Sequence, residues 1–208
     1  VDQRMGLLTG TTDFADLGQA DVIVEAIYEN IDVKVEAFQK MDAVAKPGAI
    51  LASNTSGLDV DKMAAATKRP DSVIGLHFFS PANVMRLLEI VRGADTSKET
   101  IASSMKLGRT LNKIAVLSGN APGFIGNRML AGYTRQAGEI ILQGATPYQV
   151  DNALLQFGMP MGPFQMNDLV GLDLGWRARK LGGMKPEDVP ITARVADKLC
   201  EMDRYGQK

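Results

Sequence analysis

The chain has 208 residues, 45% of them hydrophobic, and its 23 Lys and Arg against 24 Asp and Glu give a formal net charge of -1. This length suits one large domain or two modest ones, and the charge provides no general attraction for nucleic acid or an anionic membrane surface. The single cysteine, Cys200, excludes an internal disulfide and a zinc cluster built on cysteines, and no apolar run approaches the roughly 20 residues that span a bilayer.

The first half of the chain alternates between predicted strands and predicted helices. Segments 21–27, 49–53 and 72–79 are short apolar runs, typical of strands that are buried on both faces. Helical spacing of apolar residues predicts helices within 30–48 and 58–67, which lie between these strands. This alternation predicts a parallel sheet with right-handed crossovers.

The pattern changes after the third predicted strand. Segment 86–93 is a further strand, and the loop before it is too short for a parallel crossover, so this strand is predicted to be antiparallel. A helix is predicted within 96–113, where Thr96 and Glu99 have the spacing of a capping box. Segment 114–119 is predicted to be the last strand.

From Asn120 onward the sequence predicts helices alone. Thr146 is a predicted N-cap, followed by a proline at the first helical position. Helices are predicted within 122–144, 146–158, 161–180 and 191–202. With a boundary near Ser118, the chain is therefore expected to contain an α/β domain over 1–118 and an all-helical domain over 119–208.

His77 is the only histidine of the chain, and Glu89 lies on the next predicted strand. If the chain reverses around Asn83, the two become cross-strand neighbours that can hydrogen-bond. A carboxylate on one imidazole nitrogen fixes the tautomer and leaves the other nitrogen to accept a substrate proton, which suits oxidation of an alcohol. Spacing alone leaves open a buried histidine that is satisfied by backbone groups and unrelated to the glutamate.

Polar side chains follow two of the predicted parallel strands. Asn54, Thr55 and Ser56 come after one strand, and Glu29 and Lys34 follow another. Because open parallel sheets bind ligands at the carboxyl ends of their strands, these side chains are candidates for one ligand site. Turn formation explains the first group equally well, and a solvated start of a helix explains the second.

Asn127 is a candidate at the junction of the two predicted domains. Pro122 and Gly123 suit the entry to a helix, and Asn127 is expected one turn inside it. From there a polar side chain can reach an interdomain cleft, a common place for ligands, although an Asn in an amphipathic helix is usually only surface.

Several motifs in chain order resemble the 3-hydroxyacyl-CoA dehydrogenase family, specifically the dehydrogenase part of multifunctional fatty-acid β-oxidation enzymes. The resemblance covers nearly the whole chain. The motifs are VEAIYEN, ASNTSGL, GLHFFSP followed by LLEIVRG, APGFIGNRML and FGMPMGPFQMNDLVGLD.

The resemblance implies NAD-dependent oxidation of (S)-3-hydroxyacyl-CoA to 3-oxoacyl-CoA. In this family the histidine of the HFF motif is the base and the glutamate of the next strand pairs with it, which gives these roles to His77 and Glu89. Ser56 then contacts the substrate hydroxyl and the cofactor, and Asn127 helps to place the substrate. No metal is implied.

Three further residues match cofactor-contacting positions of the family. Glu29 and Lys34 do so directly. Ser80 replaces the Asn of the common HFFNP motif, and its hydroxyl can still donate a hydrogen bond on the nicotinamide side, over a shorter reach. Ser80 is therefore a weaker cofactor residue.

The Gly-rich dinucleotide fingerprint of the family does not occur in this sequence. The expected fold is therefore α/β: a partial Rossmann-type sheet domain, with the first βαβ unit and its Gly-rich loop missing, followed by an all-helical C-terminal domain. Such a chain would carry the catalytic half of the cofactor cleft without its phosphate-binding half.

Two other functions compete with this reading. The chain could be a non-catalytic fragment whose helical domain serves docking, either as a homodimer or onto a homologous helical domain of the parent chain. A related dehydrogenase acting on another hydroxy acid is the third hypothesis, and the motifs of the helical part disfavour it. The resemblance implies a bacterial cytoplasmic or a peroxisomal location.

Overall fold

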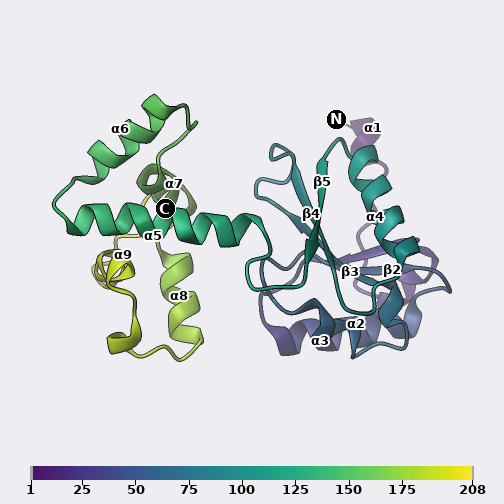
Figure 1. Cartoon of the computed structure of the whole chain (residues 1–208). Helices are drawn as coiled ribbons and strands as arrows, with labels where there is room; N and C mark the ends of the chain where they lie inside the picture. Colours follow the sequence, from purple (N-terminus) through teal and green to yellow (C-terminus); the bar gives the residue numbers. More distant parts are fainter. Residues whose placement is uncertain (1, 208) are drawn as a thin grey trace. The chain divides into compact units, whose positions relative to one another are not determined.

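A computed structural model of the chain describes residues 2–207. By its internal contacts the chain divides into two compact units, Val1–Arg128 and Met129–Lys208. Figure 1 shows the sheet within the first unit and helices alone within the second. Each unit has the class that the sequence predicts for it: a Rossmann-type α/β unit comes first and a helical unit follows.

The first unit is built on one five-stranded sheet. Its strands are β1 (Val22–Glu25), β2 (Ile50–Ser53), β3 (Val73–Phe78), β4 (Leu87–Arg92) and β5 (Ile114–Gly119). They lie side by side in chain order, parallel throughout except for the antiparallel pair of β3 and β4. The predicted change of direction after the third strand is thus confirmed.

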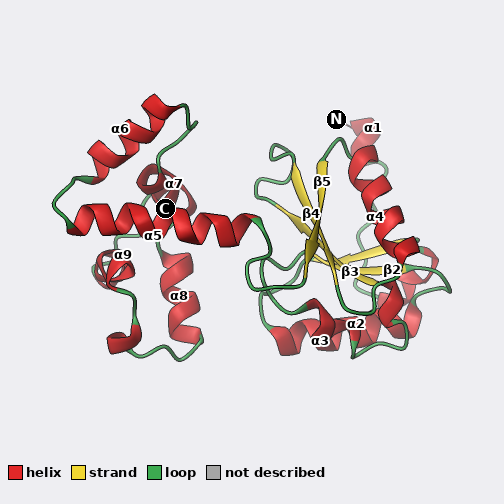
Figure 2. Ribbon diagram, viewed as in Figure 1, coloured by secondary structure: helices red, strands yellow, loops and turns green. Residues whose placement is uncertain are grey.

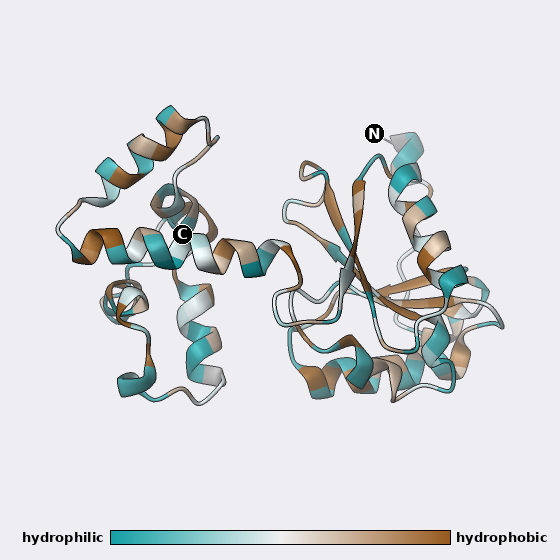
Figure 3. Ribbon diagram, in the orientation of Figure 1, coloured by the Kyte–Doolittle hydropathy of each residue, from teal (hydrophilic) through white to brown (hydrophobic). Residues whose placement is uncertain are grey.

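Helices cover both faces of this sheet. The helices of this unit are α1 (Asp2–Met5), α2 (Ile31–Val44), α3 (Val60–Ala64) and α4 (Lys98–Thr110), with 3-10 turns η1 (Phe14–Gln19) and η2 (Pro70–Ser72). In Figure 2, α4 lies on one face of the sheet, and α2 and α3 lie on the other. Figure 3 shows the strands between them as largely hydrophobic, as expected where both faces are covered.

The core of this unit has two parts, one on each face of the sheet. Phe38 and Met63, from α2 and α3, pack on one face against strand residues such as Leu51. Ile74 and Ile90 form the other part, against which α4 packs. Alternate residues of an inner strand such as β3 thus enter different halves of the core.

The predicted capping box of the helix before the last strand is wrong. Ser97, not Thr96, is the N-cap of α4, and its hydroxyl accepts the backbone N–H of Thr100. The Thr96 hydroxyl instead donates to the carbonyl of Val73 at 2.8 Å and accepts the N–H of Gly93. Thr96 therefore ties the loop to the sheet, and a contact distant in sequence outweighs the local spacing.

The helical unit begins within α5 (Gly126–Leu142), which starts in the last residues of the first unit. It continues with α6 (Pro147–Phe157), α7 (Pro163–Val170), α8 (Asp173–Leu181), η3 (Pro186–Asp188) and α9 (Ile191–Glu201). The predicted N-cap is confirmed, because Thr146 forms a capping box with Gln149. Within residues 2–207, no helix is long and apolar enough to cross a membrane.

The segment between the last strand and α5 packs on the first unit. The Asn120 amide donates to Asp59 at 2.6 Å and to Asp61 at 2.8 Å. This attachment explains why the contacts divide the chain after Arg128, whereas the change of sequence pattern lies near Ser118. The connecting residues follow the sheet domain in sequence and remain bound to it.

Candidate active site

His77 and Glu89 are direct cross-strand partners on β3 and β4. The imidazole Nδ1 lies 2.7 Å from Oε2 of the carboxylate, and both side chains are buried. The predicted juxtaposition is therefore confirmed. The alternative of an unrelated glutamate is wrong, because the carboxylate is the partner of the ring.

The other oxygen of Glu89 binds the start of α5. Its Oε1 accepts the backbone N–H of Ile125 at 2.9 Å and that of Gly126 at 2.8 Å. A carboxylate only accepts hydrogen bonds, so Nδ1 of His77 is the donor in this pair and Nε2 is the ring nitrogen that Glu89 does not bind. No group of residues 2–207 hydrogen-bonds Nε2, so this nitrogen is available to a substrate proton.

Two aromatic rings flank the imidazole. The centroid of Phe79 lies 4.3 Å from that of His77, and the centroid of Phe124 lies 5.7 Å away. Gly126 leaves room for the first ring, since a Cβ at this position would lie 2.9 Å from Phe79. The pair of His77 and Glu89, called the dyad below, therefore has apolar surroundings, which strengthen its hydrogen bond.

Glu29 links the ends of the first two strands. Its Oε1 accepts the hydroxyl of Thr55 at 2.6 Å, and the N–H and hydroxyl of Ser56 at 2.9 Å and 3.2 Å. Partial burial acts to raise the pKa of Glu29, but these hydrogen bonds and the nearby Lys34 outweigh it and lower the pKa. Glu29 is thus an ionised acceptor beside Ser56.

Lys34 does not lie at a solvated start of a helix, as one interpretation of the sequence held. Its side chain is 1% exposed, and its ammonium lies 2.6 Å from Glu25 and 3.2 Å from Glu29. Glu25 also accepts the hydroxyl of Ser53 at 2.6 Å. Sequence reasoning missed Glu25 and Ser53, and the available signal was a charged residue inside an otherwise apolar strand.

Asn127 is the second residue of α5, not one turn inside it. The helix starts later than predicted because Gly123 and Phe124 have positive φ, at 72° and 49°, which no helix accommodates. The Asn127 amide donates to the carbonyl of Ser56 at 3.0 Å. Asn127 therefore links the start of α5 to the loop after β2, and it directly follows Gly126, whose N–H binds Glu89.

The remaining polar candidates have different surroundings. Asn54 accepts the N–H of Phe78 at 2.9 Å, which ties the end of β2 to the end of β3. Ser80 is exposed in the loop after β3. The structure thus brings together Ser56, Glu29 and Asn127 by direct contact, and His77 with Glu89. Asn127 directly follows Gly126, so both groups meet the start of α5.

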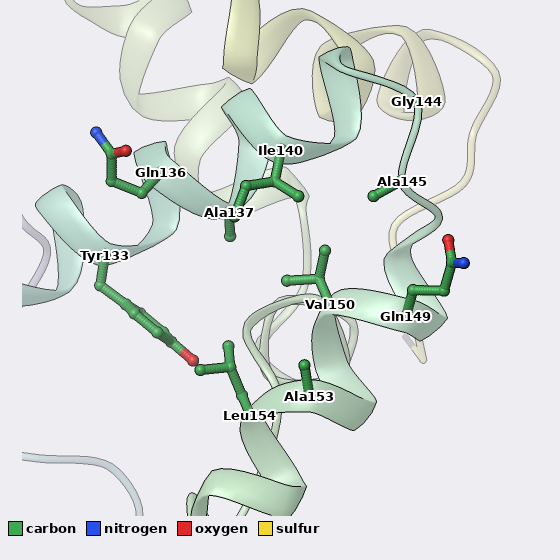
Figure 4. A pocket seen from close by; sticks show the side chains of 10 residues that line it. All are labelled: Tyr133, Gln136, Ala137, Ile140, Gly144, Ala145, Gln149, Val150, Ala153 and Leu154. Carbon is green, nitrogen blue, oxygen red and sulfur yellow. The ribbon is translucent and has the colours of Figure 1, made fainter.

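The helical unit has a cavity of its own, of about 640 Å³. Its lining is largely apolar and comes from α5, α6 and the turn between them (Figure 4). Figure 4 shows the Tyr133 side chain reaching from α5 toward Leu154 of α6. None of the predicted site residues lines it. Within residues 2–207, no cluster of His, Cys, Asp and Glu is suited to hold a metal.

Solved structures resemble this chain over almost its entire length. FadB2 from M. tuberculosis is 37% identical with a TM-score of 0.87, and the match covers 99% of this chain and 74% of that one. (S)-3-hydroxybutyryl-CoA dehydrogenase PaaH1 from Ralstonia eutropha is 33% identical with a TM-score of 0.86, over 99% of this chain and 74% of that one.

Curated relatives include peroxisomal bifunctional enzymes. That of Danio rerio is 45% identical over 219 residues, and that of Homo sapiens is 46% identical over 209 residues. These matches cover 100% and 95% of this chain, but the chain spans only 30% and 29% of the two enzymes.

Family models match both units. Residues 1–121 match the NAD binding domain of 3-hydroxyacyl-CoA dehydrogenase, and residues 123–208 match the C-terminal domain. The chain therefore belongs to the 3-hydroxyacyl-CoA dehydrogenase family.

Proposed function

We propose that this chain carries out the NAD-dependent oxidation of (S)-3-hydroxyacyl-CoA to 3-oxoacyl-CoA in fatty-acid β-oxidation. The observation that carries the proposal is the buried pair of His77 and Glu89, joined at 2.7 Å, with no hydrogen-bond partner for Nε2 of the ring among the described residues. Membership of the dehydrogenase family supports it.

In this proposal His77 is the general base. Its Nε2 accepts the proton of the substrate 3-hydroxyl, while Glu89 stabilises the imidazolium through Nδ1. NAD, when bound, supplies the acceptor for the hydride that leaves C3. Ser56 and Asn127 orient the reactants, since their polar groups lie together at the start of α5. Phe79 and Phe124 limit the access of water to the ring.

The chain's residues fit the nicotinamide side of the cofactor. Ser56, Glu29 and Ser80 are exposed polar groups that follow strands β1 to β3 at their carboxyl ends, where parallel sheets bind ligands. We propose them as cofactor residues. Lys34 acts on the cofactor indirectly, by binding Glu29, because its ammonium is already bound by the two carboxylates of Glu25 and Glu29. The printed sequence has no G-x-G-x-x-G fingerprint for the pyrophosphate side.

We further propose a peroxisomal location and a docking role for the helical unit. The names of the curated relatives support the location. Large apolar side chains such as Tyr148 and Phe157, 77% and 84% exposed, support burial against a second copy or a homologous helical domain. Sedimentation velocity tests the self-association: a dimer supports the first partner, and a monomer at all concentrations contradicts it.

A coupled pair of measurements tests the proposed reaction. The absorbance of NADH is followed with (S)-3-hydroxybutyryl-CoA and with its (R) enantiomer, and binding of NAD is measured by calorimetric titration. The proposal predicts micromolar binding of NAD and oxidation of the (S) form alone. No NAD binding and no oxidation would contradict it and favour a non-catalytic docking unit.

A further inference from the structure

Lys34 is a charged side chain without contact with solvent. It stands in the first turn of α2, is 1% exposed, and its ammonium meets Glu25, Glu29 and the carbonyl of Ile27. An ammonium has three N–H donors, so these three partners use all of them. Burial of a lysine is costly, and such complete pairing offsets the cost while fixing the side chain in one position.

Glu25 holds this lysine from the end of β1. Its Oε1 binds the Lys34 ammonium and the N–H of Ile27, both at 2.6 Å, and its Oε2 accepts the Ser53 hydroxyl at the end of β2. The carboxylate is thus anchored to two strands of the sheet. The hydrogen bonds of Glu25 therefore set the position of the ion pair relative to the ends of these strands.

Glu29 connects the buried pair to the exposed site. One oxygen lies 3.2 Å from the Lys34 ammonium, and the other accepts from Thr55 and from Ser56. Because a carboxylate has no proton, the hydrogen bond between Glu29 and the Ser56 hydroxyl uses the hydroxyl's own proton. The lone pairs of the Ser56 oxygen are then left for a ligand.

We propose that Glu25 and Lys34 are positioning residues that hold Glu29 against Ser56, so that the Ser56 hydroxyl presents itself to the bound ligand as a hydrogen-bond acceptor. This inference rests on the proposed function for the contact of Ser56 with the reactants. The single proton of the substrate hydroxyl goes to His77. The donor that Ser56 recognises is then a group other than this hydroxyl, and we assign it to an N–H of amide type, such as the carboxamide of a nicotinamide.

The test is an NMR titration of the Glu29 side-chain carboxyl in the chain itself. The charged group in contact with Glu29 is Lys34 of α2, whose ammonium also binds Glu25 of β1; the other recorded partners of Glu29, Thr55 and Ser56, are neutral. In Glu25→Gln the lysine charge is no longer balanced, so the titration midpoint of Glu29 falls. In Lys34→Met the cation is lost and a negative neighbour remains, so the midpoint rises.

Opposite shifts in these two variants are expected if Glu25 and Lys34 act on Ser56 through Glu29, a chain of contacts that we call the relay. Loosening of the structure alone would move both midpoints in the same direction, toward the usual value, and equal or absent shifts overturn the proposal. If Lys34→Met does not fold, Glu25→Gln combined with Lys34→Met removes both charges of the buried pair, and its Glu29 midpoint is still expected to rise because the cation is lost. Glu36→Gln, an exposed change on α2, is the matched control and leaves Glu29 unchanged.

A kinetic cycle connects the relay to Ser56. Glu25→Gln is expected to lower kcat/KM by about tenfold in the original chain and to have little further effect beside Ser56→Ala. Equal losses in both backgrounds contradict a route through Ser56. The NMR titration needs neither substrate nor cofactor, so its failure is distinguishable from failure of the proposed function.

Discussion

At the scale of single residues, Glu29 makes the stability of the fold depend on pH. Its pKa in the folded chain lies below the usual value of 4.5. The ionised form is therefore favoured by folding: its stabilisation is present in full above pH 4.5 and is lost as the pH falls through the folded pKa.

Comparison of the original chain with Glu29→Gln by urea unfolding measures this dependence. The original chain is expected to be more stable at neutral pH, and the difference is expected to shrink in acid. Gln39→Ala, an exposed change on α2 without a titrating group, should give a difference that does not vary with pH. A difference for Glu29→Gln that stays constant from neutral pH to acid contradicts the account.

The residues also differ in how far the sequence could predict them. The equal distances of His77 and Glu89 from the assumed turn at Asn83 predicted their contact, because the centre of the turn sets which residues pair in an antiparallel ladder. The contact of Glu25 with Lys34 depends on how α2 packs on β1, and no local pattern specifies that geometry. Polar residues after the predicted strands indicated candidates for the site, but not which of them become buried partners.

At the scale of elements, the start of α5 is fitted closely to the dyad. Gly126 lies against Phe79, where an added Cβ would be 2.9 Å from the ring. In Gly126→Ala the Phe79 ring must move, and this changes its contact with the imidazole of His77. We expect kcat/KM to fall while the chain stays folded, and the His77 ring signals in NMR spectra to shift.

Gly132→Ala is the matched control on the same helix. A Cβ at Gly132 meets nothing within 4 Å. Because alanine favours a helix over glycine by about 1 kcal/mol, this change should raise stability slightly and leave the rate unchanged. A similar loss of rate in both variants would show that contact with Phe79 is not the cause.

The start of α7 depends on a side chain of another helix. Gly162 provides no cap, and the carboxylate of Asp151 on α6 instead accepts the N–H groups of Phe164 and Gln165, at 3.0 Å and 2.9 Å. Asp151→Asn keeps one acceptor and loses the charge at the helix N-terminus. We expect a loss of about 1 kcal/mol in unfolding free energy, measured in urea.

The pKa of Tyr133 reports the same substitution. Burial of this residue, and then the charge of Asp151, raise its pKa above the usual 10.0. Asp151→Asn should therefore lower the pKa of Tyr133 in an alkaline NMR titration. Asn152→Ala, an exposed neighbour on α6, should leave both quantities near their original values. An unchanged pKa for Tyr133 in Asp151→Asn contradicts the contribution of the charge.

At the scale of the whole molecule, hydrophobic patterning predicted the strands and the helical second half. Runs such as 72–79 lie in a sheet covered on both faces, where burial leaves a strong signal in sequence. The late start of α5 was not predictable, because it depends on the positive φ angles of Gly123 and Phe124, and Phe124 is buried among core residues that are distant in sequence. Patterns thus revealed the architecture, and tertiary contacts fixed the details of the site.

The central claim is that a carboxylate-bound histidine takes the substrate proton. The most direct measurement is kcat for NADH formation from (S)-3-hydroxybutyryl-CoA in the original chain, His77→Ala and Glu89→Gln, with circular dichroism as the check on folding. We expect folded variants whose kcat is lower by about 10² to 10⁴. Near-normal turnover in both folded variants would contradict the claim.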